Sequence, residues 1–405
     1  MTTPTSVLEH LDRTTHQIFG RDDLVQRLES GAPMRIKFGV DCTAPDLHLG
    51  HAVNLWMMRY LQDLGHRVVF LLGDTTSRIG DPTGRSRTRP VLDAEQIDAN
   101  ARAFLAQVGL VLRSDPELLE IRRNSEWYDR MSITDLLSEL SLTTHAYLIA
   151  RDMFQDRIAS DDEIGVHELI YPVLQGFDSV ALESDLTIVG SDQLFNETVG
   201  RHLQAKHGQR PQTVITSTIT PGLDGGAKQS KSLDNYVALT HSPGEKLGRL
   251  MTLQDDLIEL WARVYTDLSS SSVADLGARA RVGGPAARDA KLDLAEAVVA
   301  RYHGAVEARR ARAEFIRVFA RQGVPADVAA VVLDQEPRTM VELVRELRPD
   351  LSGNAARRLV IEGAVSMNGA TVTNPSEAVR PVVGDVIRAG RRRWFSVAAP
   401  PATHE

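Results

Sequence analysis

Two histidines lie close together in the stretch from Gly39 to His51, which reads GVDCTAPDLHLGH. An apolar run precedes this stretch and a helical pattern follows it, so His48 and His51 are expected on one face of the first turn of a helix. The start of a helix has free backbone N–H groups and a partial positive charge, which bind phosphate readily. The stretch predicts a phosphate site, although an isolated His-x-x-His is more often a plain pair at a capped helix start.

A second group of chemically active side chains lies in the stretch from Lys228 to Ser232, which reads KQSKS and follows a loop with three glycines. A mobile loop of this composition can close over a triphosphate, and its lysines can neutralise the charge that develops as pyrophosphate leaves. Taken alone, such a loop is usually a solvated turn. The sequence contains neither G-x-x-x-x-G-K-[ST] nor a G-x-G-x-x-G after a strand, which excludes the Walker and dinucleotide modes of phosphate binding.

The elements that must position these groups alternate between strand and helix in the first half of the chain. Apolar spacing predicts a strand over 36–40, a helix over 49–64 and a strand over 68–72. Further strands are expected over 186–189 and 213–219. This alternation indicates an α/β fold with a parallel sheet covered by helices on both faces, and sites in such sheets lie at the carboxyl ends of the strands.

The second half of the chain has a different pattern, with helices first and short strands later. Helical spacing of apolar residues predicts helices over 245–251, 255–265, 286–303 and 306–322. Strands are expected over 365–368, 370–372, 386–389 and 394–397. We therefore expect a sheet domain over 1–235, a helical domain over 236–325, a linker over 326–338 and a small α+β domain over 339–405.

Composition limits the class of protein. With 405 residues, 42% hydrophobic and 25% charged, the chain is expected to be globular and to form two or three domains. It has no leader-like start and no apolar run near the length of about 18 that a membrane span requires, so we expect a cytoplasmic protein. Cys42 is the only cysteine, which excludes an intrachain disulfide and a cysteine-based zinc site.

The charge is unevenly distributed. The whole chain carries a net charge of −8, which argues against nucleic acid binding over its entire surface. Residues 336–405 contain ten arginines and eight acidic side chains, a net charge of +2. This basic end is a candidate RNA contact, with a solvated surface as the plain alternative.

The two chemically active stretches resemble a known pair of signatures. HLGH and KQSKS resemble the HIGH and KMSKS motifs of class I aminoacyl-tRNA synthetases. The segments 171–178 (YPVLQGFD), 190–196 (GSDQLFN) and 73–84 (GDTTSRIGDPTG) are similar, in the same order, to the segments of bacterial tyrosyl-tRNA synthetases that bind tyrosine, ribose and the amino-acid ammonium. The resemblance covers nearly the whole chain.

The resemblance implies a fold, an activity and partners. It implies a Rossmann-like catalytic domain with an inserted dimerisation and acceptor region at about 90–185, an anticodon-binding helical domain, and a C-terminal RNA-binding domain shared with a ribosomal small-subunit protein. It implies a tyrosine-tRNA ligase that uses ATP and Mg²⁺ without zinc, acts on L-tyrosine and tRNA(Tyr), forms a homodimer and does not bind a membrane.

The resemblance also assigns residues. It assigns the amino acid to Lys37, Thr76, Asp81, Tyr171, Gln175, Asp178 and Gln193, with Asp178 accepting from the phenol hydroxyl. It assigns ATP to Asp41, Gly50, Gly190, Asp192, Lys231 and Ser232. It assigns catalysis at the departing phosphates to Thr43, His48, His51, Lys228 and Lys231. A mobile clamp is assigned to Arg85 and Arg89, and RNA binding to Arg357, Arg358, Arg391, Arg392 and Arg393. It assigns no residue to a metal.

Three positions depart from the common pattern, and other functions stay open. Lys37 stands where many members have a tyrosine against the substrate hydroxyl, Cys42 replaces a proline, and Gln229 and Asp234 replace a methionine and a glycine. Lys37 is compatible with an ordinary subgroup or with a paralogue for a ring-modified tyrosine. A non-catalytic RNA-binding protein on this scaffold, or an adenylating enzyme with another acceptor, are the alternatives.

Overall fold

The chain forms two compact units, residues 1–305 and 306–405. The computed structural model describes residues 3–41, 47–81, 94–320, 328–390 and 393–398. The helical segment expected over 236–325 is divided between the two units. None of the helices in these described ranges is long and apolar enough to cross a membrane.

A six-stranded sheet forms the centre of the first unit. Its strands are β1 (Thr15–Phe19), β2 (Arg35–Val40), β3 (Arg67–Leu72), β4 (Leu119–Arg123), β5 (Leu186–Gly190) and β6 (Thr213–Ser217). They follow the order β1-β6-β5-β2-β3-β4, in which β2 to β6 are parallel and only β1 is antiparallel to its neighbour. The predicted parallel sheet is therefore confirmed, with an antiparallel edge strand that its short, unpatterned sequence did not reveal.

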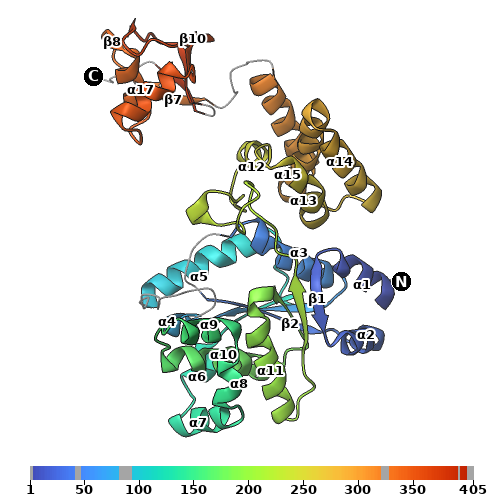
Figure 1. The fold of residues 1–405 in the computed structure, drawn as a ribbon. Helices are drawn as coiled ribbons and strands as arrows, with labels where there is room; N and C mark the ends of the chain where they lie inside the picture. Colours follow the sequence, from blue (N-terminus) through green and yellow to red (C-terminus); the bar gives the residue numbers. More distant parts are fainter. Residues whose placement is uncertain (1–2, 42–46, 82–93, 321–327, 391–392, 399–405) are drawn as a thin grey trace, which may run out of the picture. The chain divides into compact units, whose positions relative to one another are not determined.

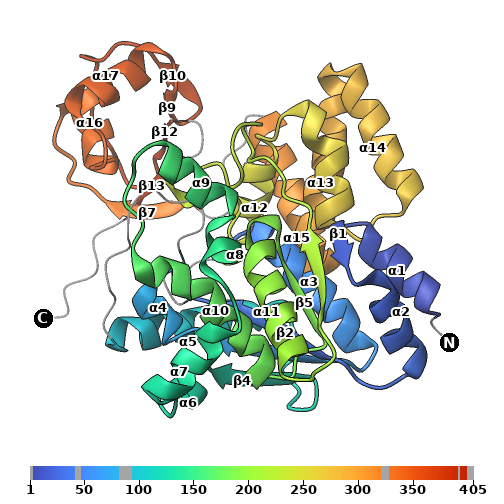
Figure 2. The same cartoon turned by 60° about the horizontal axis from the view of Figure 1, so that its bottom comes forward.

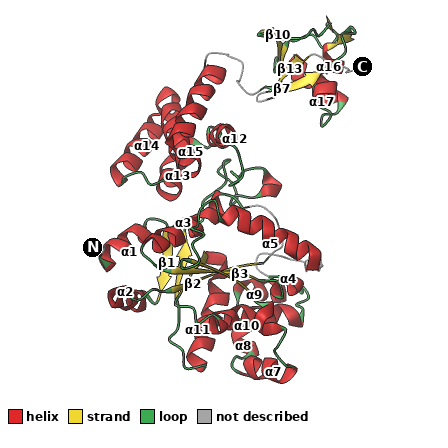
Figure 3. Cartoon of the chain, turned by 180° about the vertical axis from the view of Figure 1, so that it is seen from behind, coloured by secondary structure: helices red, strands yellow, loops and turns green. Residues whose placement is uncertain are grey.

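Helices cover both faces of this sheet. The helices α3 (Leu49–Asp63) and α5 (Ala94–Val108) lie on one face, and α10 (Val166–Ala181) and α11 (Leu194–Lys206) lie on the other (Figure 1). Seen from behind, the strands again lie between these two helical layers (Figure 3). All residues from Val68 to Leu72 in β3 are buried, as expected of a strand that is covered on both sides.

Shorter helices complete this part of the unit. They are α1 (Pro4–Asp12), α2 (Arg21–Ser30), α4 (Thr76–Ile79), α6 (Ser125–Tyr128), α7 (Ile133–Ser141), α8 (His145–Ile149) and α9 (Asp152–Ala159), with 3₁₀ turns at Ser191–Gln193 and Lys231–Leu233. The region expected as an insertion at about 90–185 thus contains β4 of the main sheet together with α5 to α10.

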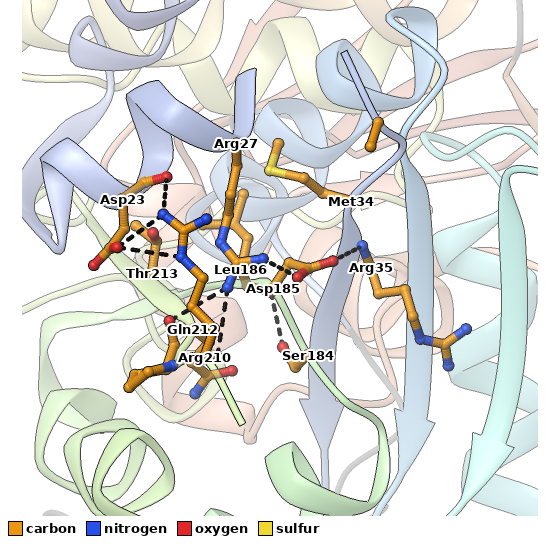
Figure 4. Close-up of polar contacts among 12 residues, drawn as sticks. Asp23, Arg27, Met34, Arg35, Ser184, Asp185, Leu186, Arg210, Gln212 and Thr213 are labelled. Atoms are coloured by element: carbon orange, nitrogen blue, oxygen red, sulfur yellow. Dashed lines mark hydrogen bonds and ion pairs between the residues drawn. The ribbon is translucent and has the colours of Figure 1, made fainter. Parts of the chain in front are cut away.

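The amino ends of three strands are joined through Asp185, just before β5. Its Oδ2 accepts the backbone N–H of Arg35 at 2.9 Å, and its carbonyl accepts the backbone N–H of Thr213 at 2.9 Å. Its Oδ1 forms a close ion pair with Arg27 of α2 (Figure 4). Arg210 pairs with Asp23 of the same helix at 2.9 Å. These contacts hold α2 against the amino ends of the strands, at the edge of the sheet opposite their carboxyl ends.

A helical segment follows the sheet. It comprises α12 (Pro243–Leu250), a 3₁₀ turn (Asp255–Leu257), α13 (Ile258–Tyr265), α14 (Ser270–Val282) and α15 (Gly284–Phe315), which a π-helical turn (Ile316–Ala320) extends. The helices α13 and α14 pack side by side (Figure 2). Gly304 has φ of +83° and breaks α15 at the boundary expected between the predicted helices 286–303 and 306–322.

The second unit contains a small sheet with helices. After the end of α15 and the π-helical turn, its elements are β7 (Ala329–Val332), β8 (Arg338–Thr339), α16 (Met340–Leu347), α17 (Gly353–Ile361), β9 (Val365–Met367), β10 (Ala370–Val372), β11 (Ala378–Val379), β12 (Val386–Ala389) and β13 (Trp394–Ala398). Five strands follow the order β10-β9-β12-β13-β7. The segment 326–338, expected as a linker, thus supplies β7, which pairs in parallel with β13.

Candidate active site

A cavity of about 470 Å³ opens at the carboxyl ends of β2, β3, β5 and β6. This is the position expected of a ligand site in a parallel α/β sheet. The predicted residues that line it are Lys37, Asp41, His48, Gly50, His51, Thr76, Asp81, Tyr171, Gln175, Asp178, Gly190, Asp192, Gln193 and Lys228. Groups far apart in the sequence therefore meet in one place.

Of the remaining predicted residues of this site, only Lys231 has a described side chain. Lys231 is exposed in the turn after Lys228 and does not line the cavity. Thr43, Arg85 and Arg89 lie outside the described residues, as does the side chain of Ser232.

The turn that begins α3 fixes the orientation of both histidine rings. His48 is the N-cap residue, and its Nδ1 accepts the backbone N–H of Gly50 at 3.1 Å. The Nδ1 of His51 accepts the backbone N–H of His48 at 3.3 Å. A neutral imidazole that accepts at Nδ1 carries its proton at Nε2. Both rings, whose centroids are 3.8 Å apart, thus keep one N–H donor for a ligand.

The histidines are neutral near pH 7. Burial, the neighbouring His51 and the Lys228 amine lower the pKa of His48 to about 3. Enclosure in the cavity wall and the Lys228 amine also lower the pKa of His51, although part of its ring remains exposed to solvent. The pair therefore supplies hydrogen bonds rather than positive charge.

The lowered pKa of His48 predicts a pH dependence of stability. Histidine in the unfolded chain has a pKa of about 6.5. Below this pH the unfolded state therefore binds a proton that His48 in the folded state, with a pKa of about 3, does not yet bind. Stability is therefore lost as the pH falls through this window. His48→Asn keeps the cap acceptor, and its free energy of unfolding should fall less than that of the wild type between about pH 7 and about pH 5.

Urea denaturation at the two pH values measures this difference. His16→Asn, at an exposed position of β1, is the matched control and should keep the wild-type pH dependence. Equal pH dependence of the wild type and His48→Asn would show that His48 is not held neutral by the fold.

The loop that carries Lys228 and Lys231, here called the lysine loop, follows β6. Backbone hydrogen bonds close its base. The N–H of Gly222 donates to the carbonyl of Ala227 at 2.9 Å, and the N–H of Leu223 donates to the carbonyl of Asn235 at 2.9 Å. A side chain at Gly222 would come within 2.2 Å of the Asn235 amide, so only glycine fits there. Lys228 is 66% exposed, and its Nζ lies 3.5 Å from Asp192 Oδ2.

A backbone bridge joins the residues around His48 to the segment 237–239, which follows the KQSKS stretch. The N–H of Leu49 donates to the carbonyl of Val237 at 2.9 Å, and the N–H of Leu239 donates to the carbonyl of Leu47 at 3.0 Å. His48 and Ala238 thereby form an antiparallel bridge. Lys246, which is fully buried, donates to the carbonyl of Leu239 at 2.6 Å and holds this segment in place. The bridge fixes the position of the turn at His48, which begins α3, relative to the segment that follows the lysine loop.

One wall of the cavity is a face of α10. Tyr171, Gln175 and Asp178 follow at spacings of four and three residues, so they lie on the same side of the helix. Asp178 accepts from Trp127 Nε1 at 3.0 Å and from Asn124 Nδ2 at 3.5 Å. Burial raises the pKa of Asp178 to about 7 even though Lys37 lies nearby. This end of the cavity is suited to a ligand hydroxyl that donates to a carboxylate.

Another part of the cavity gathers hydrogen-bond acceptors. Asp41 Oδ2 accepts from the Tyr171 hydroxyl at 3.0 Å, and its Oδ1 accepts from the Thr76 hydroxyl at 2.8 Å. Asp81 accepts from Gln193 Nε2 at 2.7 Å. Two carboxylates among neutral acceptors match an ammonium group. Asp41 is expected at the nucleotide, but it contacts residues that are expected at the amino acid. It therefore lies between the expected nucleotide part and the expected amino-acid part of the site.

Several lining or supporting residues were absent from the prediction. Lys37 forms an ion pair with Glu197 at 2.8 Å, and both side chains are only 2% exposed. None of the motifs in the sequence includes Glu197, Asn124 or Trp127. Glu197 contacts Lys37, and the other two contact Asp178. A lysine in a buried strand does require a counter-charge, and this was the one available signal for Glu197.

The arginines expected to bind RNA belong to the second unit. Arg357 and Arg358 are exposed on α17, and Arg358 lies 3.9 Å from Glu362. Arg393 is exposed just before β13. Arg391 and Arg392 lie outside the described residues.

Comparison with known proteins identifies a family. Residues 29–320 match the family described as tRNA synthetases class I (W and Y). The tyrosine-tRNA ligase of Cupriavidus pinatubonensis is 45% identical over 371 residues, which cover 91% of this chain and 88% of the relative. That of Thermotoga maritima is 37% identical over 396 residues, which cover 98% of each chain.

Solved structures show the same fold. A C-terminally truncated mitochondrial tyrosyl-tRNA synthetase from Aspergillus nidulans matches with a TM-score of 0.64 and 22% identity, covering 79% of this chain and 95% of the other. A tyrosyl-tRNA synthetase from Archaeoglobus fulgidus, complexed with L-tyrosine, matches with a TM-score of 0.58 and 20% identity, covering 76% and 99%. The predicted fold class is confirmed.

Proposed function

The chain belongs to the W and Y family of class I tRNA synthetases, and from this premise we propose that it is a tyrosine-tRNA ligase that activates L-tyrosine with ATP and transfers it to tRNA(Tyr). One observation carries the proposal. A single cavity brings together a buried carboxylate at Asp178, a group of ammonium acceptors around Asp81 and the N–H donors of His48 and His51. These groups match the two ends of tyrosine and the phosphates of ATP.

The polar contacts favour ordinary tyrosine as the substrate. Asp178 is the acceptor for the phenol hydroxyl, and a phenylalanine ring would leave this buried carboxylate without that donor. The Lys37 ammonium is neutralised by Glu197 at 2.8 Å and donates to Ser179 at 2.7 Å. Lys37 is therefore already engaged within the protein, which argues against a role in binding an acidic ring substituent.

The reaction requires no covalent nucleophile on the protein. The carboxylate of tyrosine attacks the α-phosphorus of ATP, so an acyl–phosphate bond forms while the bond to the departing pyrophosphate breaks. The Nε2–H groups of His48 and His51 hydrogen-bond the phosphates, and Lys228 leaves Asp192 to neutralise pyrophosphate. Asp192 is then available for the ribose. The terminal hydroxyl of tRNA takes the acyl group and releases AMP.

ATP enters as its magnesium complex in this proposal. Among the described residues, no group of three or more histidine, cysteine or acidic side chains is arranged to hold a metal ion. The cation would therefore be carried mainly by the phosphates, whose negative charge it reduces. With ATP and tRNA as the proposed substrates, we propose that the activity is cytoplasmic.

Amino-acid-dependent exchange of labelled pyrophosphate into ATP tests the proposal. Tyrosine should support exchange, whereas phenylalanine and tryptophan should support it at least about 100-fold less well, because the buried Asp178 carboxylate would lack the donor that the phenol hydroxyl supplies. If none of the amino acids supports exchange, the proposed enzyme activity is refuted, and the alternative is an RNA-binding protein on this scaffold. A ring-substituted tyrosine that far outpaces tyrosine would instead indicate a specialised paralogue.

We propose that the later parts of the chain bind tRNA. The segment 236–325 would approach the anticodon, and 339–405 would contact structured RNA through its arginines. The exposure of Arg357, Arg358 and Arg393 supports phosphate contacts of this kind, which read the shape of RNA more than its sequence. An enzyme with a different acceptor would keep its acyl transfer after deletion of 339–405.

A homodimer is proposed on the exposed apolar side chains of the first unit. Ile133 and Leu137 on α7, Ile158 on α9 and Val166 on α10 are all strongly exposed.

We expect Ile133→Asp with Leu137→Asp to shift the protein from dimer to monomer, because charges would enter an apolar interface. Light scattering after size exclusion measures the mass. Val282→Asp is the control, since Val282 is 77% exposed, close to the 78% of Ile133, but lies on α14. A wild-type monomer would refute the dimer.

A further inference from the structure

Glu197 lies at the centre of a buried polar network that reaches from Lys37 to Asp81. Its Oε2 accepts from Lys37 Nζ at 2.8 Å and from Gln212 Nε2 at 2.9 Å. Its Oε1 accepts from Gln175 Nε2 at 2.8 Å. Glu197 lines the cavity, but none of the motifs described above includes it.

The carboxylate determines which way the Gln175 amide points. An ionised carboxylate can only accept hydrogen bonds, so Gln175 must turn its NH₂ group toward Glu197. The Oε1 of Gln175 then points away from Glu197 and accepts from Asn196 Nδ2 at 2.8 Å. Gln175 therefore presents an oxygen, and not an NH₂ group, on the side away from Glu197.

Asp81 imposes the same direction from the other end of the network. It accepts from Gln193 Nε2 at 2.7 Å, which leaves Gln193 Oε1 to accept from Asn196 Nδ2 at 3.1 Å. Two amide oxygens thus converge on one nitrogen. Each carbonyl oxygen has a second lone pair, and an ammonium group has three donors to offer.

We propose that Glu197 is a positioning residue for recognition of the substrate ammonium, because it orients the Gln175 amide with its oxygen toward that group. This role rests on the proposed function, in which Gln175 contacts the amino group of tyrosine. Lys37 supports the arrangement by pairing with Glu197 at 2.8 Å, which gives the buried carboxylate a counter-charge. The lysine thus acts on the amino end of the substrate through Glu197.

Binding of two ligands to the full-length protein tests the proposal. One ligand is L-tyrosine, and the other is 3-(4-hydroxyphenyl)propanoate, which lacks the amino group. Glu197→Gln has the same shape but allows the Gln175 amide to turn over, since an amide can both donate and accept. We expect Kd for tyrosine to rise at least about tenfold, as for a lost hydrogen bond to a charged group, and Kd for the analogue to change less than about twofold.

Two results would overturn the proposal. An equal loss of affinity for both ligands would indicate a general distortion of the pocket. Unchanged affinity for tyrosine would show that Gln175 does not depend on Glu197. Isothermal titration calorimetry distinguishes these outcomes directly.

A second variant addresses the lysine that Glu197→Gln leaves without a counter-charge. Lys37→Met combined with Glu197→Gln removes both buried charges, and the selective loss of tyrosine affinity should persist. This double variant decides the question if the single variant does not fold. Glu168→Gln is the matched control, because Glu168 is also buried and paired, with Arg157 at 2.9 Å, but does not line the cavity. Its Kd for tyrosine should stay within about twofold of wild type.

Failure of this inference can be told apart from failure of the proposed function. Pyrophosphate exchange by the wild-type protein tests the function alone. If the wild type exchanges with tyrosine but Glu197→Gln weakens both ligands equally, only the positioning role of Glu197 is refuted.

Discussion

Replacing Asp178 with alanine is expected to lower the ratio of kcat/KM for tyrosine to that for phenylalanine by about 100-fold. The carboxylate is 4% exposed and already accepts from Trp127 and Asn124, so it is held in place for one further donor. The alanine variant loses the acceptor for the phenol hydroxyl. It also removes the buried carboxylate that a phenylalanine ring would leave without this further donor, so kcat/KM falls for tyrosine and rises for phenylalanine.

Pyrophosphate exchange with each amino acid measures this ratio. Glu168→Gln, a buried carboxylate outside the cavity, should leave the ratio unchanged. If Asp178→Ala slows both substrates equally, Asp178 supports the pocket without reading the hydroxyl, and the assignment of this end of the cavity is wrong.

His48→Asn is expected to lower kcat for adenylate formation by about 100-fold while KM for tyrosine changes less than about twofold. Asparagine keeps an acceptor for the backbone N–H of Gly50, so the start of α3 is preserved. What disappears is the Nε2–H donor that is proposed to bind the phosphates. Because the histidine is neutral near pH 7, the loss is that of a hydrogen bond and not of a charge.

His48→Gln separates the two roles of this side chain. Its longer amide places an NH₂ group near the position of Nε2 but is poorly suited to cap the helix. If the donor matters, the glutamine variant should lose only about tenfold in kcat. A glutamine variant that is less active than the asparagine variant would show that capping of α3, and not the donor, explains the effect.

The sheet was predictable because burial on both faces leaves a simple record in the sequence. The strands predicted over 36–40 and 68–72 correspond to β2 and β3 within one residue at each start. The strand β1 was missed, because its five residues are half-exposed and do not alternate in polarity. The strand β7 was missed for a related reason: its small apolar side chains are mostly exposed, so burial did not shape them.

The site was predictable to the extent that the residues expected to bind ligands line the cavity. Residues with such roles fall in short motifs, and the structure brings His48, Lys228 and Asp178 into one cavity. Residues that act through another side chain leave no such pattern. The contacts of Trp127 with Asp178 and of Glu197 with Lys37 depend on tertiary packing between distant elements. The departure at Lys37 is explained only when its partner is known.

The pairing of β1 with β6 has a consequence for synthesis on the ribosome. Thr15 pairs with Ser217, and His48 bridges to Ala238, so the first strand and the turn at His48 find their partners only after about 200 further residues have been made. At about 5–20 residues per second, this interval lasts on the order of 10–40 s. A nascent chain that has not yet reached Thr213 leaves the edges of both β1 and β5 without β6, and such unpaired edges can pair with another chain.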